Sequence, residues 1–200
     1  MKTRREKKMK GLSTELLTRV ALAAPGDDEA IFTALGAILT DMRGRPVVLK
    51  RTAFPPDTAS GLWLDLQDMD IIAVRDDTTN SEHEHVILGH EIWHMFEGHC
   101  GVHTPAGRAS ARADATHPSA VADVVTQLLA TGDERLHNLS APQLSYAART
   151  HFDNRHEAEA EMFGLRLGTD LRTFRESNRR ADLGQVAGRI EESLGRGLWG

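Results

Sequence analysis

The sequence lacks the features that mark secreted, disulfide-bonded or membrane proteins. Cys100 is its only cysteine, so no disulfide can form within the chain. No apolar run approaches the roughly 20 residues of a membrane-spanning helix. Only residues 20–24 are continuously apolar near the start, which is too short for a secretion signal. These absences predict a cytoplasmic protein with no membrane association.

Charge is unevenly distributed along the chain. The net charge is −5, yet the first ten residues, MKTRREKKMK, carry six basic side chains and one acidic one. The acidic remainder argues against a nucleic-acid-binding surface, so we expect no direct contact with nucleic acid. A short basic run is typical of a solvated terminus, and we predict that residues 1–11 are disordered. Contact with an acidic partner is the alternative.

The remaining pattern predicts an α+β domain that is mostly helical. Helical stretches are expected at residues 12–24, 27–42, 81–98, 121–130, 142–172 and 182–194. Short apolar blocks bounded by Pro, Gly or Asp predict strands at residues 47–52, 61–66 and 70–75. We expect these strands to form a small antiparallel sheet that packs on helix 81–98. Residues 12–200 are predicted to be a single domain with an inserted segment at about 101–150.

The stretch GHEIWHMFEGHC, residues 89–100, places three polar side chains in an apolar helix. His90 and His94 are four residues apart, so they share a face and can ligate one zinc ion. Glu91, about 100° away, can reach a water on that ion and accept its proton, and is therefore the candidate catalytic base. The alternative is a pair of core histidines hydrogen-bonded to backbone or to Glu91.

A catalytic zinc ion usually has a third protein ligand. The metzincin spacing fails, because Glu97 and Cys100 stand where glycine and histidine are needed; Cys100 itself stays an alternative ligand. On a helical wheel of residues 155–168, Glu159 falls inside the arc of apolar side chains, so it is the predicted third ligand. Pairing of Glu159 with Arg166 is its alternative. The neighbouring carboxylates, Glu157 and Glu161, fall outside the arc and are predicted to be solvated.

Together, HEIWH and the later EAEMFG resemble the ImmA/IrrE family of zinc metallopeptidases. In that family an HExxH helix is joined by a downstream helix with an E-A-x-x-F-A-like pattern, and residues 159–164 match it with Gly164 in place of alanine. The resemblance covers roughly residues 30–100 and 150–172. It implies a minimal gluzincin-like metallopeptidase domain that holds one Zn²⁺ through His90, His94 and Glu159. Glu91 is then the catalytic base.

The resemblance also implies a protein substrate, a helix-turn-helix repressor that is cleaved to relieve repression. The rival is a non-catalytic, zinc-containing binding, toxin or regulator module of a two-gene system. The 65 residues from His94 to Glu159 are more than the family usually has, and we expect the inserted segment to shape the substrate cleft. Other polar residues lie nearby in sequence. Four histidines are expected to be surface or helix-end residues, with a second metal or a contact to the zinc ligands as the alternative (His83, His85, His99, His103). Three further residues are candidate oxyanion donors (Tyr146, His151, His156).

Overall fold

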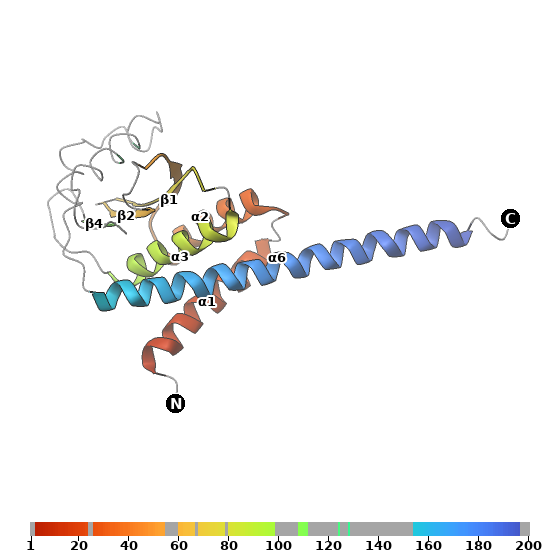
Figure 1. The fold of residues 1–200 in the computed structure, drawn as a ribbon, viewed down its shortest axis with the longest axis horizontal. Coiled ribbons are helices and arrows are strands. Elements are labelled where there is room, and N and C mark those ends of the chain that lie inside the picture. Colours follow the sequence, from red (N-terminus) through yellow and green to blue (C-terminus); the bar gives the residue numbers. More distant parts are fainter. Residues whose placement is uncertain are drawn as a thin grey trace.

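The computed structural model describes residues 3–23, 26–54, 60–66, 68–78, 80–98, 108–111, 124, 128 and 154–196. Its helices are α1 (Arg4–Ala23), α2 (Asp28–Arg43), α3 (Ser81–Glu97) and α6 (Asn154–Arg196), and its strands are β1 (Val47–Thr52), β2 (Gly61–Asp65), β3 (Asp70–Arg75) and β4 (Arg108–Ala111). This is the predicted α+β, mostly helical architecture (Figure 1). The inserted segment predicted at 101–150 lies outside the described residues, apart from β4 and two buried positions, Val124 and Leu128.

Helices α2 and α3 begin and end at residues suited to those positions. The side chain of Asp27 accepts a hydrogen bond from the backbone amide of Ala30, and Asn80 does the same for Glu82, so each caps a helix start. Gly44 and Gly98 end the two helices in the left-handed conformation that favours glycine. The predicted bounds of both helices are therefore confirmed to within one or two residues. In the first turn of α3, Glu84 accepts hydrogen bonds from Arg51 of β1.

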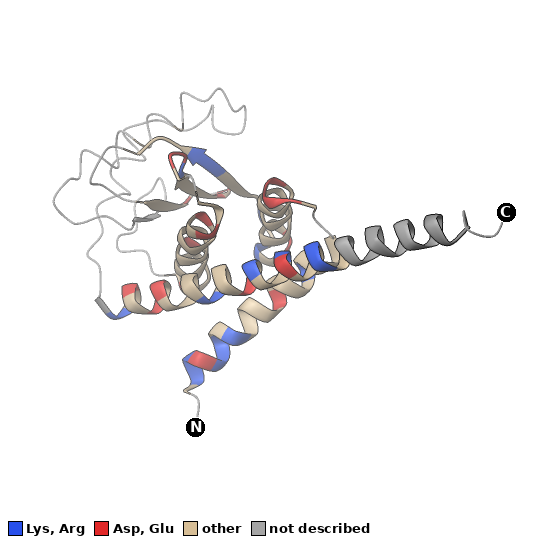
Figure 2. Cartoon of the chain, turned by 45° about the vertical axis from the view of Figure 1, so that its right-hand side comes forward, with Lys and Arg blue, Asp and Glu red and all other residues tan. Residues whose placement is uncertain are grey.

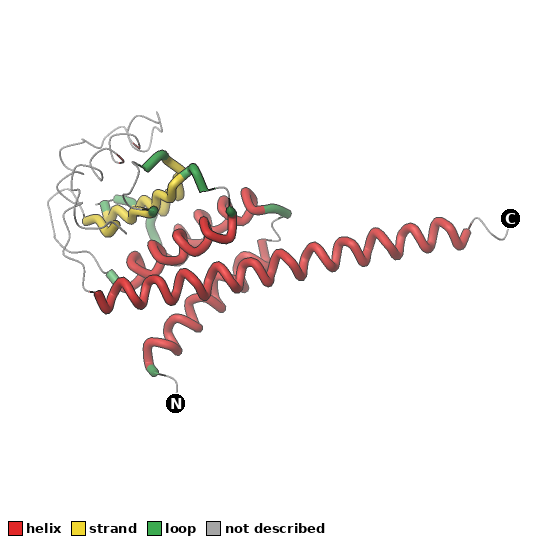
Figure 3. The backbone as a smooth tube through the Cα atoms, viewed as in Figure 1, coloured by secondary structure: helices red, strands yellow, loops and turns green. Residues whose placement is uncertain are grey.

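The sheet has the order β1-β3-β2-β4 and lies over α2 and α3 (Figure 3). The predicted hairpin of β2 and β3 is confirmed, with Trp63 opposite Ile72 and Leu64 opposite Ile71. The prediction of a purely antiparallel sheet is wrong, because β1 pairs with β3 in parallel. Strand β3 takes the central position, as expected for a strand whose residues are buried from Asp70 to Val74.

A buried carboxylate explains why β1 and β3 start at the same end of the sheet. Asp70, the first residue of β3, is 0% exposed and accepts hydrogen bonds from Arg43 and Arg45 at 2.9 and 2.8 Å. These two arginines stand directly before β1. Trp63 of β2 donates a third hydrogen bond to Asp70 through Nε1 at 2.9 Å. Charged hydrogen bonds are the strong ones, so Asp70 links the end of α2 and the starts of β1 and β3 in one cluster.

Helices α3 and α6 cross closely and run in opposite directions. Arg175 reaches Ser81, Gly168 lies against Val86, and Gly164 lies against Gly89, so residue numbers rise along α6 as they fall along α3. A Cβ atom at position 164 would stand 2.4 Å from the carbonyl oxygen of Val86. Two apolar rings reinforce this contact, because Trp93 stacks on Phe163 with centroids 5.1 Å apart. Glycine at the crossing therefore sets how near the two backbones come.

The basic N-terminal segment forms part of helix α1, which begins at Arg4. The prediction that residues 1–11 are disordered is therefore wrong from Arg4 onward. Met9 is only 4% exposed and anchors this part of α1 in the core. Arg5 pairs with Glu159 of α6, and Lys8 pairs with Glu97 of α3. Arg5 and Lys8 of α1 thus pair with acidic residues of α6 and α3. Figure 2 shows the basic residues gathered at the N-terminal end of α1. Apolar anchoring and ion pairing together explain why a run of like charges is helical here.

One long helix replaces two predicted ones at the C-terminal end. Residues 154–196 are continuous helix, whereas the sequence predicted a break before residue 182. Its C-terminal half extends past the rest of the described chain (Figure 1). No helix among the described residues combines the length and the apolar character needed to cross a membrane.

Gly164→Ala should destabilise the protein, because the new methyl group meets backbone of α3 that cannot rotate away. We expect a loss of about 1–3 kcal/mol in the free energy of unfolding, as for overpacked cores. Gly11→Ala on α1 is the matched control, since nothing lies within 4 Å of its Cβ position. That variant should gain about 0.5–1 kcal/mol from helix propensity. Urea unfolding of both variants measures this, and equal stability of the two would contradict the close crossing.

His85 should make stability depend on pH. It is 1% exposed, and burial lowers its pKa below the ordinary value of 6.5, against the smaller opposing effects of Asp28 and Glu84. Below about pH 6.5 the unfolded chain therefore binds more protons than the folded protein. The stability that depends on a neutral His85 is fully present above pH 6.5 and is lost as the pH falls below it. His85→Leu should flatten the decline in unfolding free energy below about pH 6.5, by about 1.4 kcal/mol per unit of pKa depression. His83→Leu, at an exposed position of the same helix, should leave the decline unchanged.

Candidate metal centre

Helix α3 buries the polar residues of HEIWH in the middle of the molecule. His90 and Glu91 are each 0% exposed, and His94 is 2% exposed. The helix packs under β2 and β3 on one side and on α6 on the other, so its polar side chains have protein on all sides (Figure 1). Burial of this kind requires polar partners. The helical spacing brings the two imidazoles together, with Nε2 of His90 3.0 Å from Nε2 of His94.

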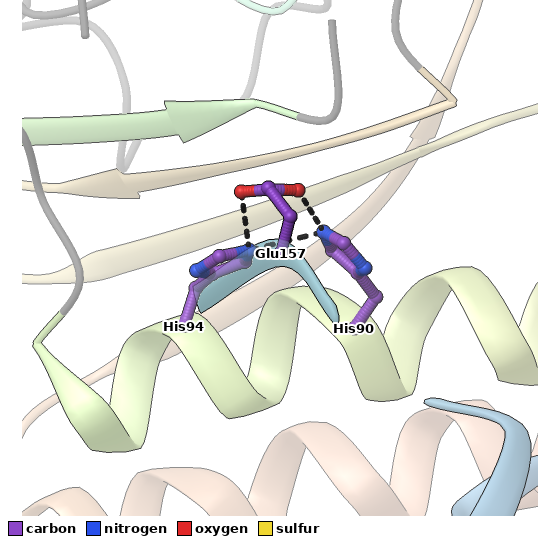
Figure 4. A group of neighbouring side chains, drawn as sticks. All are labelled: His90, His94 and Glu157. Carbon is purple, nitrogen blue, oxygen red and sulfur yellow. Dashed lines mark hydrogen bonds and ion pairs between the residues drawn. The ribbon is translucent and has the colours of Figure 1, made fainter. Parts of the chain in front are cut away.

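A carboxylate from α6 completes this pair. Oε2 of Glu157 lies 3.4 Å from Nε2 of His90, and its Oε1 lies 3.2 Å from Nε2 of His94 (Figure 4). The carboxylate stands over the gap between the two rings. Among the described residues, His90, His94 and Glu157 form a group in which each side chain offers one ligand atom, and these atoms lie within 4.8 Å of one another. His90, His94 and Glu157 can therefore hold a metal ion.

The electrostatics of Glu157 favour the charged carboxylate that a cation needs. Burial alone would raise its pKa, but hydrogen bonding to His90 and His94 outweighs burial and lowers the pKa from 4.5 to about 2. The side chain is 23% exposed, more than the two histidines, so one edge of the group is open to solvent. Glu157 is therefore ionised at neutral pH, facing two imidazole nitrogens that carry no charge when deprotonated.

Glu159, the predicted third ligand, occupies a different place. It is 7% exposed, so the prediction that it points inward is confirmed, but it pairs with Arg5 of α1 and with Arg155 one turn before it. Glu157 takes the place beside the histidines and is not solvated as predicted. The predicted alternative partner, Arg166, instead lies 3.6 Å from Asp170.

The wheel misplaced the centre of the inward face, although Glu159 is buried, because it followed side-chain hydrophobicity. Met162 and Leu165, which defined part of the apolar arc, are 51% and 60% exposed. The face that α6 presents to α3 is lined by small and buried residues (Ala160, Phe163, Gly164, Leu167, Gly168, Leu171). Glu157 shares this face, because it precedes Gly164 by seven residues and Gly168 by eleven. The two glycines are the sequence signal that identifies it.

Glu91 lies against β2 and is not among the converging ligand atoms. A Cβ atom at Gly61, the first residue of β2, would stand 2.7 Å from its Oε1 and 2.9 Å from its Cγ. The carboxylate is thus held between the motif helix and the start of a strand. Glu91 is on the same segment of α3 as His90 and His94, but its carboxylate is not one of the converging groups.

The other candidate residues divide between described and undescribed positions. His83 is exposed, His85 is buried and His156 is half-buried. None of the three belongs to the converging group formed by the described residues. Glu97 pairs with Lys8, and Glu161 is exposed. The remaining candidates lie outside the described residues (Cys100, His99, His103, Tyr146, His151).

Comparison with known proteins yields no match to any family model, curated protein or solved structure. Assignment of a function therefore depends on the chemistry of His90, Glu91, His94 and Glu157. It also depends on the resemblance in sequence of the two motifs to ImmA/IrrE metallopeptidases.

Proposed function

We propose that the chain is a zinc-dependent endopeptidase with a minimal gluzincin-like domain. Its metal ligands are His90, His94 and Glu157, one zinc ion binds per chain, and Glu91 is the catalytic base. The substrate that the sequence resemblance favours is a helix-turn-helix repressor, whose cleavage relieves repression. Glu157 replaces Glu159 in the ligand set on the evidence of distance to the imidazoles.

The observation that carries the proposal is the spacing of the ligand atoms. The two imidazole Nε2 atoms are 3.0 Å apart, and the two oxygens of Glu157 lie one at each imidazole, Oε2 at 3.4 Å from His90 and Oε1 at 3.2 Å from His94. A tetrahedral zinc ion with bonds of about 2.0–2.1 Å separates neighbouring ligand atoms by about 3.3–3.4 Å. Two neutral imidazoles and one carboxylate are also the donor set of many zinc hydrolases. The residues therefore fit zinc in chemistry and in spacing, and leave a fourth position for a non-protein ligand.

Each polar residue of the site has a distinct task in peptide hydrolysis. Bound zinc supplies Lewis acidity to a water molecule and to the substrate carbonyl. Glu157 contributes one negative charge, whereas His90 and His94 contribute none, so the ligand set leaves a net positive charge at the metal. Glu91 accepts the proton of the attacking water at its carboxylate and transfers it to the leaving amine.

Zinc content separates the two candidate carboxylates. The purified protein should bind about one zinc ion per chain, and His90→Ala or His94→Ala should abolish stoichiometric binding. Glu157→Ala should weaken binding by about 100-fold or more, because a ligand is lost. Glu159→Ala is the matched control on the same helix, and should retain near-stoichiometric zinc while losing the ion pair with Arg5.

Competition with a chromophoric chelator measures these affinities. Unchanged zinc affinity of Glu157→Ala, together with a large loss in Glu159→Ala, would contradict the ligand set. Circular dichroism of each variant shows whether the helices are retained, so that loss of a ligand is distinguished from loss of the fold.

Glu91→Gln should retain zinc and abolish cleavage, because an amide cannot accept the proton of the attacking water. Incubation of the zinc-loaded protein with a candidate helix-turn-helix repressor, followed by intact mass, should show a single cut with the wild type and none with Glu91→Gln. Near wild-type cleavage by the variant would contradict the mechanism. A stable complex with no cut by either protein would favour the non-catalytic binding module.

A further inference from the structure

Gly61 of the sheet lies close to the carboxylate of Glu91. It opens β2 and pairs with Val74 of β3. A Cβ atom there would stand 2.7 Å from Oε1 and 2.9 Å from Cγ of Glu91, and 2.8 Å from Cγ2 of Ile87. Real Cβ atoms do not approach other heavy atoms this closely, so any side chain at this position must displace its neighbours.

Backbone conformation does not explain the glycine. Among the described residues, positive φ angles at glycine occur at Gly44 and Gly98, both helix ends. Gly61 lies in regular antiparallel pairing, where an L-amino acid with a side chain is normally favoured over glycine. Glycine in a strand weakens it by lacking a side chain to pack and by its larger conformational entropy. The space that it leaves is occupied by Glu91 and Ile87.

The contact at Gly61 also differs in kind from the one at Gly164. At Gly164 the obstructing atoms belong to the backbone of α3, so a methyl group there disturbs helix packing. At Gly61 the nearest obstructing atoms belong to side chains, Oε1 and Cγ of Glu91 and Cγ2 of Ile87. A methyl group at Gly61 therefore meets the side chain of Glu91 at closer range than the backbone of α3.

We propose that Gly61 is a positioning residue for Glu91: the missing side chain creates the space in which the carboxylate lies against the start of β2. This inference deepens the proposed function and rests on it for its catalytic consequence. The packing between Gly61 and Glu91 stands independently of any reaction. Displacement of a catalytic group by about 1 Å can lower a rate by about 100-fold, so the position of this carboxylate matters for turnover.

A double-mutant cycle tests the packing without relying on catalysis. Gly61→Ala should lower the thermal unfolding midpoint of the wild-type protein. The same change in a Glu91→Ala background should lower it by less than half as much, because the carboxylate no longer obstructs the methyl group. Equal losses in both backgrounds would overturn the proposal. Gly36→Ala is the control, since its Cβ position has only ordinary contacts of 3.6 Å or more.

Kinetics with the cognate protein substrate test the consequence for catalysis. Gly61→Ala should lower kcat by about tenfold to 100-fold with zinc content unchanged and KM within about twofold, because substrate and metal binding are retained. Gly61→Ala combined with Ile87→Leu, which removes Cγ2, should stay equally slow. Recovery of wild-type kcat in that double variant would assign the effect to Ile87 and overturn the proposal.

The two measurements separate failure of this inference from failure of the proposed function. If the wild-type protein cuts no partner, the proposed function fails, and the stability cycle alone decides whether Gly61 positions Glu91. If the wild-type protein cuts its partner and the cycle shows no coupling between positions 61 and 91, this inference fails and the proposed function stands.

Discussion

The candidate site depends on how closely α3 and α6 approach each other. Glycine at positions 89, 164 and 168 removes the side chains that would hold the two backbones apart. The crossing is antiparallel, so Glu157, two turns before Gly164 on α6, meets the turn of α3 that carries His90 and His94. Bulkier residues at the crossing would separate the imidazoles from the carboxylate. The polar chemistry of the site is therefore a consequence of a close apolar contact.

Ionic contacts around the site fix the elements that hold it. Asp70 joins α2 and the starts of β1 and β3, Arg51 joins β1 to Glu84 of α3, and Arg5 joins α1 to Glu159 of α6. Each pair includes a carboxylate at most 10% exposed, where unpaired charge is costly. Inside this frame the two histidines and Glu157 have one another as partners. Asp70, Glu84 and Glu159 are thus paired with arginine, and Glu157 is directed at imidazole.

Sequence patterns predicted the elements that depend on contacts between residues close together in the chain. The motif helix, its glycine stop and the β2–β3 hairpin follow from caps, apolar periodicity and turn residues. The parallel pairing of β1 with β3 depends on Asp70 meeting arginines 25 and 27 residues away, which no periodicity reveals. The helical state of residues 4–11 depends in the same way on partners on α3 and α6. Glu157 was missed because Met162 and Leu165 are apolar yet exposed, whereas Gly164 and Gly168 mark the buried face.

X-ray diffraction from zinc-loaded crystals at the zinc absorption edge tests the central claim most directly, because the anomalous signal locates the ion and its ligand atoms together. The account predicts one strong peak within about 2.0–2.2 Å of Nε2 of His90, Nε2 of His94 and one carboxylate oxygen of Glu157. Glu159 should remain paired with Arg5 in the same crystals. A peak bonded to Glu159 or Cys100, or no peak between the two histidines, would contradict the account.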